Sequence, residues 1–176
     1  SSVCQGGTPT TLSVAYQNGT GTPSYQWYSN TVNSNSGGTI IPTAQSDSYI
    51  PPTATVGTTY YYCVITLSAG GCTSITSNTA TVTVTELPSI STQPLSTQRI
   101  CQGGTIAPLT VAYTDGTGTP SYQWYSNTVN SNSGGTIIPG AQSNNYTPSA
   151  FNTTGTFYFY ATVSLSGSGC GNITSN

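Results

Sequence analysis

A stretch of 24 residues occurs twice in the chain without a single difference. Gly19–Pro42 and Gly116–Pro139 both read GTGTPSYQWYSNTVNSNSGGTIIP, and they lie 97 residues apart. After one extra residue in the second copy, an offset of 98 relates Cys72 to Cys170. Self-similarity at a fixed period marks a repeated structural unit. The chain is therefore expected to hold two copies of one domain, each about as long as this offset.

The segment that joins the two copies places the domain boundary. It begins as the alternating stretch TATVTVT and then reaches Glu86-Leu87-Pro88. We place the boundary at Pro88, which gives repeat 1 at residues 1–87 and repeat 2 at residues 88–176. A short joint that contains proline favours a semi-rigid, end-to-end array.

The two copies are cut at different points of the repeat. Copy two ends at Asn176, where copy one continues into TATVTVT, and copy one begins three residues before Cys4. Repeat 1 is expected to lack its first strand and repeat 2 its last strand. We interpret the sequence as a window on a longer array, with donation of the missing edge strand by a neighbouring subunit as the alternative.

Charge is almost absent, and this excludes several classes of function. The chain has one Lys or Arg, three Asp or Glu and no His, whereas about 25% of residues are charged in an average domain. One Arg cannot neutralise a nucleic-acid backbone. Without His there is no Ser-His-Asp triad and no His metal site. We expect no enzyme, no cofactor, no bound metal and no nucleic-acid partner. No apolar run approaches the ~18 residues of a membrane-spanning helix, so no membrane insertion is expected.

The pattern of the chain predicts an all-β sandwich. Thr, Val, Tyr and Ile are enriched, Gly, Pro and Asn punctuate the sequence at short intervals, and no stretch has helical periodicity. In the run Tyr60–Leu67, one face carries Tyr61, Cys63, Ile65 and Leu67, and its counterparts in copy two are all apolar. This face is predicted to be the core, and the face that carries Tyr60 and Tyr62 to be at or near solvent.

Several motifs resemble the immunoglobulin fold. Trp27 on an early strand, followed by Tyr61-Tyr62-Cys63, is similar to its buried Trp and tyrosine corner. The CQGG, SYQWYSNT and SISTQPLSTQ segments resemble Ig-like tandem repeats of large secreted surface proteins of Bacteroidota, including gliding-adhesin-like cargo of the type IX secretion system. The resemblance implies two tandem Ig-like β-sandwich domains, with Trp27, Trp124, Tyr61 and Phe159 in their cores.

Four of the five cysteines form a pair that recurs in both copies. In the familiar Ig pattern a bridge would join the position of Cys63 to the strand of Leu12 and Val14, but those two positions are apolar. We predict instead the bridges Cys4–Cys72 and Cys101–Cys170, which imply an oxidising compartment. Cys63, whose counterpart is Ala161, is predicted to be a buried free thiol.

The remaining expectation concerns a surface. Neighbouring Ig-like strands would place three tyrosines on one sheet face of each repeat: Tyr28, Tyr60 and Tyr62 in repeat 1, and Tyr125, Tyr158 and Tyr160 in repeat 2. These rings either contact surface glycans or a neighbouring filament, or only stabilise the sheet as cross-strand pairs. The function expected is a non-enzymatic extracellular adhesive or structural module on a bacterial cell surface, with neighbouring repeats or subunits as partners. The alternatives are a pilus-like filament subunit assembled by strand donation and a spacer in a secreted carbohydrate-active enzyme.

Overall fold

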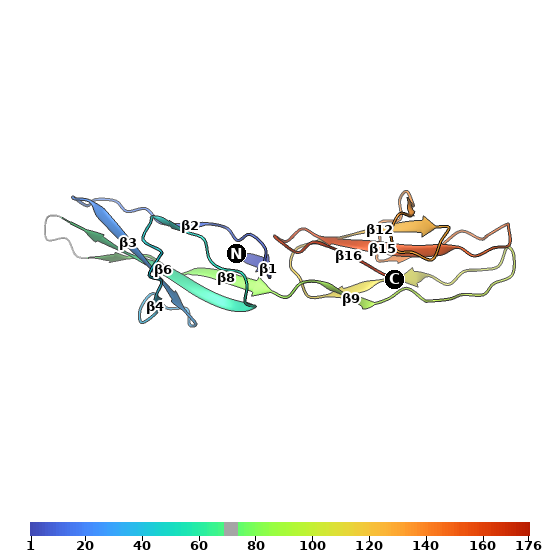
Figure 1. Cartoon of the computed structure of the whole chain (residues 1–176), viewed down its shortest axis with the longest axis horizontal. Coiled ribbons are helices and arrows are strands. Elements are labelled where there is room, and N and C mark those ends of the chain that lie inside the picture. Colours follow the sequence, from blue (N-terminus) through green and yellow to red (C-terminus); the bar gives the residue numbers. More distant parts are fainter. Residues whose placement is uncertain (69–73) are drawn as a thin grey trace. The chain divides into compact units, whose positions relative to one another are not determined.

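The computed structural model describes residues 1–68 and 74–176, and these residues form strands, turns and no helix (Figure 1). Contacts divide the chain into unit 1, Ser1–Thr85, and unit 2, Glu86–Asn176. The predicted boundary between residues 87 and 88 lies two residues beyond this division. The predicted all-β fold with two tandem domains is confirmed.

Unit 1 is built from one large sheet and one small sheet. Its strands are β1 (Ser2–Cys4), β2 (Leu12–Ser13), β3 (Pro23–Asn30), β4 (Thr39–Ile40), β5 (Ser48–Tyr49), β6 (Gly57–Leu67), β7 (Ile75–Thr76) and β8 (Ala80–Thr85). The large sheet has the order β1-β8-β6-β3-β4, with β7 also paired to β6, while β2 pairs with β5. Strand β1 is parallel to β8, and the other pairs are antiparallel.

Unit 2 repeats this plan with two differences. Its strands are β9 (Ser89–Thr92), β10 (Leu109–Thr110), β11 (Ala112–Thr114), β12 (Pro120–Asn127), β13 (Thr136–Ile137), β14 (Asn145–Tyr146), β15 (Tyr158–Leu165) and β16 (Asn172–Thr174). The main sheet has the order β13-β12-β15-β16, and the pairs β10-β14 and β9-β11 complete the unit. Unit 2 thus has an initial strand, β9, with no counterpart among the described strands of unit 1, and its own described strands include no counterpart of the paired strands β1 and β8.

The alternation of β6 sets the core of unit 1. Tyr61, Cys63, Ile65 and Leu67 are all buried, and Tyr61, Cys63 and Ile65 pack with Trp27 and Val82. The Trp27 indole nitrogen donates to the Ser46 carbonyl at 2.9 Å, which satisfies its polar atom. In unit 2, Trp124 is fully buried beside Ala161 and Val163, and the partly buried Phe159 packs against this cluster.

An Asn-Gly or Asp-Gly pair marks a turn before the Trp-containing strand of each unit. Asn18 and Asp115, each followed by Gly, have φ values of 61° and 62°. This left-handed conformation is one that Asn and Asp tolerate better than most residues. A left-handed residue thus precedes both β3 and β12, although the turns differ at the next residue, where Gly116 has a φ of 78° and Gly19 has no positive φ.

The prediction that the Tyr62 face lies at or near solvent is wrong for two tyrosines. Tyr62 and Tyr160 are only 4% and 5% exposed. The reason is the long loop after β3 or β12, which closes over the ring and donates a hydrogen bond to its hydroxyl. Period-two alternation separates the faces of a strand but does not show which loops cover the outer face.

Candidate interaction surface

The outer face of each large sheet carries a strip of aromatic and aliphatic side chains, here called the outer strip. In unit 1 it consists of Tyr28, Ile40, Tyr60 and Tyr62, and in unit 2 of Tyr125, Ile137, Tyr158 and Tyr160. Tyr28 lies opposite Tyr62 on one neighbouring strand and opposite Ile40 on the other. Residues directly opposite in antiparallel strands share a face, so the strip runs across three strands.

The two inner rings of the strip are stacked on each other. In unit 1 the Tyr28 and Tyr62 ring centroids are 5.1 Å apart and the planes differ by 5°. In unit 2 the Tyr125 and Tyr160 rings are 5.0 Å apart at 6°. Both buried rings therefore stabilise the sheet, and neither Tyr62 nor Tyr160 presents a free face to a ligand. Tyr28, Tyr60, Tyr125 and Tyr158 are half-buried.

A braced loop holds the covered rings in place. The Gly38 amide donates to the Tyr62 hydroxyl at 3.0 Å, and a Cβ at Gly38 would lie 2.7 Å from the Ser29 carbonyl oxygen. The Asn30 side-chain amide donates to the Ser34 and Ser36 carbonyls at 3.2 and 3.1 Å. Position 38 requires glycine, because the Cβ of any other residue would collide with the backbone of β3.

Unit 2 repeats the brace with the same donors and acceptors. Gly135 donates to Tyr160 at 3.1 Å, and the Asn127 side chain donates to the Ser131 and Ser133 carbonyls at 3.0 Å each. The brace is therefore a property of the repeated sequence and not of one copy.

The exposed part of each strip is aliphatic. Ile40 is 50% exposed and Ile137 is 53% exposed, and at the loop tips Val32 and Val129 are each 59% exposed. None of these residues is charged, and each repeat presents the same set. Such a surface can associate through apolar contact and shape, with little contribution from ion pairs.

The cysteines do not all pair as expected. Cys4 and Cys170 are disulfide-bonded, whereas Cys63 and Cys101 are free. The predicted Cys101–Cys170 bridge is therefore not formed, and the Cys4–Cys72 prediction falls outside the described residues because it includes Cys72. Cys101 is exposed, whereas its counterpart Cys4 lies in β1 beside β8 and is fully buried.

Cys63 is a buried free thiol in the core. It lies in the cluster against which Leu12 and Val14 pack, and burial raises the pKa of its thiol above the ordinary value, with a smaller opposite effect from the Gln26 backbone. A desolvated thiol stays protonated and unreactive. The structure thus gives Cys63 a packing role.

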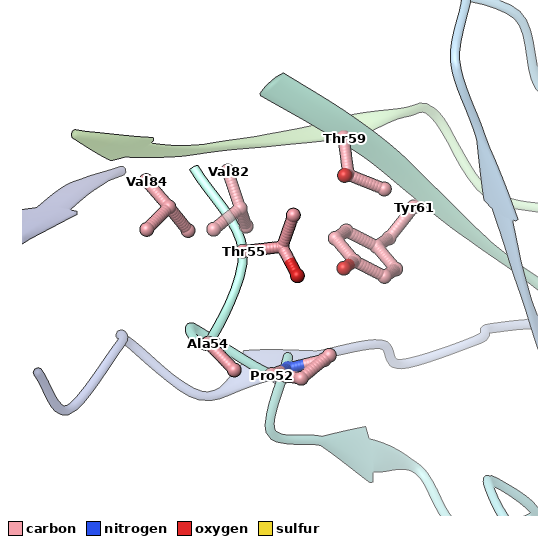
Figure 2. Close-up of a pocket in the computed structure, with 7 residues that line it drawn as sticks. All are labelled: Pro52, Ala54, Thr55, Thr59, Tyr61, Val82 and Val84. Carbon is pink, nitrogen blue, oxygen red and sulfur yellow. The ribbon is translucent and has the colours of Figure 1, made fainter. Parts of the chain in front are cut away.

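Each unit has a hollow at the inner face near the start of its Tyr-rich strand. In unit 1 it is a small cavity of about 110 Å³, where Pro52, Ala54 and Thr55 face Val82 and Val84 of β8 (Figure 2). In unit 2 a groove of about 550 Å³ includes Phe151, Phe157 and Phe159, but most of its lining is residues 126–128 and 134–139, whose counterparts do not line the cavity of unit 1.

The sequence interpretation did not single out this groove. A comparison of the two copies could have indicated the groove, because Phe157 stands where copy one has Thr59. Phe151 likewise stands where unit 1 has Thr53, since the Gly6 amide donates to the Thr53 carbonyl and the Gly103 amide to that of Phe151. A large apolar side chain at each position has replaced a small polar one.

A family model described as a domain of unknown function, DUF8696, matches residues 1–86 and again residues 91–176. The chain belongs to this family. The two DUF8696 repeats are similar in fold to Sidekick-1 immunoglobulin domains 1–5, with a TM-score of 0.50 and 18% identity over 99% of this chain. The N-terminal four Ig domains of Dscam1 isoform 8.4 match with a TM-score of 0.42 and 18% identity over 99% of this chain.

The fibronectin(III)-like modules of Clostridium thermocellum CbhA match with a TM-score of 0.41 and 15% identity, over 99% of this chain and 86% of theirs. The DUF8696 chain spans only 36% of the Sidekick-1 fragment and 41% of the Dscam1 fragment. No curated protein matches the chain significantly. The Sidekick-1 match identifies each DUF8696 repeat as an Ig-like β-sandwich.

Neither a membrane-spanning helix nor a metal-binding cluster occurs among the described residues. Among residues 1–68 and 74–176, no helix is long and apolar enough to cross a membrane. In the same part of the chain, no three His, Cys, Asp or Glu residues come together in a way that would hold a metal ion.

Proposed function

We propose that this chain is a non-enzymatic structural and adhesive module, part of a tandem Ig-like array in an extracellular bacterial surface protein. The observation that carries the proposal is the duplication of a nearly uncharged sandwich in which both copies expose the same aliphatic outer strip. Repetition of one surface along an array multiplies weak contacts into avidity. The disulfide-bonded state of Cys4 and Cys170 supports an oxidising, extracellular location.

The proposed partner surface is the exposed part of the outer strip. Charge normally keeps proteins apart in solution, and this chain has four charged residues in all. A neutral surface rich in Thr, Ser and Asn, with Ile40 and Ile137 exposed, favours lateral contact with neighbouring repeats or subunits. Surface glycans are a second kind of partner for the half-buried Tyr28, Tyr60, Tyr125 and Tyr158.

The proposed origin of the module is a large adhesin-like protein of Bacteroidota that is exported by type IX secretion. Support comes from the sequence motifs that resemble such repeats and from the Ig-like fold of both copies. In this proposal residues 1–87 and 88–176 are successive repeats of the array. A subunit of a strand-donated filament is the second candidate, favoured by residues 158–161 of β15, which pair with β12 and with no other described strand.

A two-part experiment tests the proposal. Antibodies raised against residues 1–176 should label intact cells of the source organism, and the labelled species should have a mass of hundreds of kilodaltons under non-reducing, denaturing conditions. Absence of surface labelling would refute the extracellular assignment. A surface species of about the mass of this chain would replace the array with the filament-subunit candidate.

The contact surface is tested with a double variant. Ile40→Asn with Ile137→Asn should weaken self-association measured by sedimentation or by bead aggregation, because both exposed aliphatic patches are removed. The matched control is Thr31→Asn with Thr128→Asn, at exposed loop positions outside the strip. Equal association of the two double variants would contradict a role for the strip.

A further inference from the structure

The first and last described strands of unit 1 lie side by side and run in the same direction (Figure 1). Their register sets Ser2 of β1 opposite Thr83 of β8, and Cys4 opposite Thr85. The chain therefore enters this pair at the start of β1 and leaves it at the end of β8, and these are opposite ends of the pair. A pull on the chain from both sides of unit 1 slides the two strands along each other and does not peel them apart.

Hydrogen bonds join the pair at both of its ends. The Thr83 amide donates to the Ser1 carbonyl at 2.9 Å, and the Gln5 amide donates to the Thr85 carbonyl at 2.8 Å. A sliding load stretches these bonds at the same time, so they share it, whereas a peeling load breaks them one after another. Resistance to force is governed by the rate of unfolding under load, and bonds that must break together slow that rate.

Packing and neighbouring bonds add to the resistance of the pair. Val3 of β1 and Val84 of β8 lie opposite each other and are only 1% and 5% exposed. On its other side β8 is paired with Gly57–Tyr61 of β6. Just after β1, the Gly6 amide donates to the Thr53 carbonyl at 2.9 Å. Strand β1 therefore cannot slide without exposing Val3 and breaking this further bond.

We propose that the β1–β8 pair is a clamp loaded in shear, which allows unit 1 to carry tension along an array of repeats. The inference deepens the proposed function, on which it rests, by naming what the module does between a cell surface and a bound partner: it transmits force without unfolding. The clamp consists of backbone bonds and apolar burial. Since the chain has only four charged residues, its strength should hardly change with salt.

The test pulls on the intact chain in two directions. The sequence contains no lysine, so a single introduced lysine provides one side-chain amine for a handle. Glu86→Lys places it just after β8, and Thr81→Lys places it on β8 next to Ser1; both positions are exposed. The second handle is a blocked peptide tag before Ser1. A handle at position 86 loads the clamp in shear, and a handle at position 81 peels β1 away from β8.

The force at which unit 1 unfolds is measured by single-molecule force spectroscopy after reduction, because Cys4 is disulfide-bonded and a covalent bridge would take over the load. It should be severalfold higher with the handle at position 86 than with the handle at position 81, although both proteins keep every backbone bond of the clamp. Equal forces in the two directions would overturn the clamp. If reduction alone unfolds unit 1, the bridge and not the clamp carries the load, and the proposal is overturned as well.

A second arm uses a matched pair of variants at the far end of the clamp. Gln5→Pro removes the amide that donates to Thr85, whereas Gln5→Ala removes only the side-chain bond to the Ala54 carbonyl. Gln5→Pro should lower the shear force more than Gln5→Ala does, and neither should change the peeling force, because peeling breaks this bond last. An equal loss in both directions would mean a general loss of stability and would overturn the clamp. Neither arm depends on cell-surface labelling or on self-association, so failure here is distinguishable from failure of the proposed function.

Discussion

Tyr28 and Tyr62 lie directly opposite each other on β3 and β6, and their rings stack 5.1 Å apart with planes only 5° from parallel. Tyr125 and Tyr160 reproduce the arrangement in unit 2. In each pair one ring is covered by the braced loop and the other is half-buried. The pair therefore links the fold of each repeat to its outer strip: the covered ring packs in the sheet, and its partner forms part of the proposed contact surface.

Removal of the Tyr62 hydroxyl should destabilise unit 1. In Tyr62→Phe the Gly38 amide loses its acceptor, which lies 3.0 Å away, and a lost hydrogen bond of this kind costs about 1 kcal/mol. The free energy of unfolding is measured by urea denaturation. Tyr60→Phe is the control, because Tyr60 is half-buried and, within residues 1–68 and 74–176, no loop amide donates a hydrogen bond to its hydroxyl. An equal loss in both variants would show that the brace adds no stability.

Gly38→Ala should have a larger effect than loss of the hydroxyl. The added Cβ would lie 2.7 Å from the Ser29 carbonyl oxygen and 2.9 Å from Tyr62 Cε1. Relief requires a shift of backbone or of a buried ring, and overpacking of this kind costs about 1–3 kcal/mol. Thr31→Ala, at an exposed loop position, is the control. Near-identity of the two midpoints in urea would contradict the close packing.

Much of the fold follows from the sequence, but the covering of individual side chains depends on long-range contacts that cannot be predicted from the local sequence pattern. The 24-residue identity and the alternation of Tyr61, Cys63 and Ile65 predict two sandwiches with the correct inner face, because burial on one face of a strand leaves a period of two. The covering of Tyr62 was not predictable, since it depends on the path of the loop that Gly38 ends. Cys101 was predicted to pair with Cys170 but is a free, exposed thiol, because the recurrence of a cysteine pair in sequence does not show how close the two residues lie in the fold.

The buried groups of unit 1 should make its stability fall at alkaline pH. Burial raises the pKa of Cys63, Tyr49 and Tyr61. When the pKa of a thiol is higher in the folded state than in the unfolded state, the thiol contributes its full stability at pH values below the unfolded-state pKa. This contribution is lost as the pH rises toward the folded-state pKa, because the unfolded chain releases the thiol proton first. Stability should therefore hold at neutral pH and decline as the pH rises through about 9, near the ordinary thiol value.

Cys63→Ala isolates the contribution of the thiol to this decline. Ala161 occupies the same place in unit 2 and is fully buried, so the repeat tolerates the smaller side chain. The variant should lose some stability at neutral pH through the missing sulfur but show a shallower decline between neutral pH and pH ~9. Urea midpoints across this range provide the measurement. An unchanged slope would mean that Cys63 does not contribute to the decline.

Salt should have little effect on either stability or association. Ionic strength weakens interactions between exposed charges, but this chain has only one basic and three acidic residues. Association through Ile40, Ile137 and their neighbours is an apolar contact, which sodium chloride does not screen and which sulfate strengthens, because excluded salts favour burial of surface. Sedimentation in low and high sodium chloride should therefore give the same association constant, and sulfate should raise it. A steep loss of association in sodium chloride would show that the few charged residues, and not the outer strip, hold neighbouring molecules together.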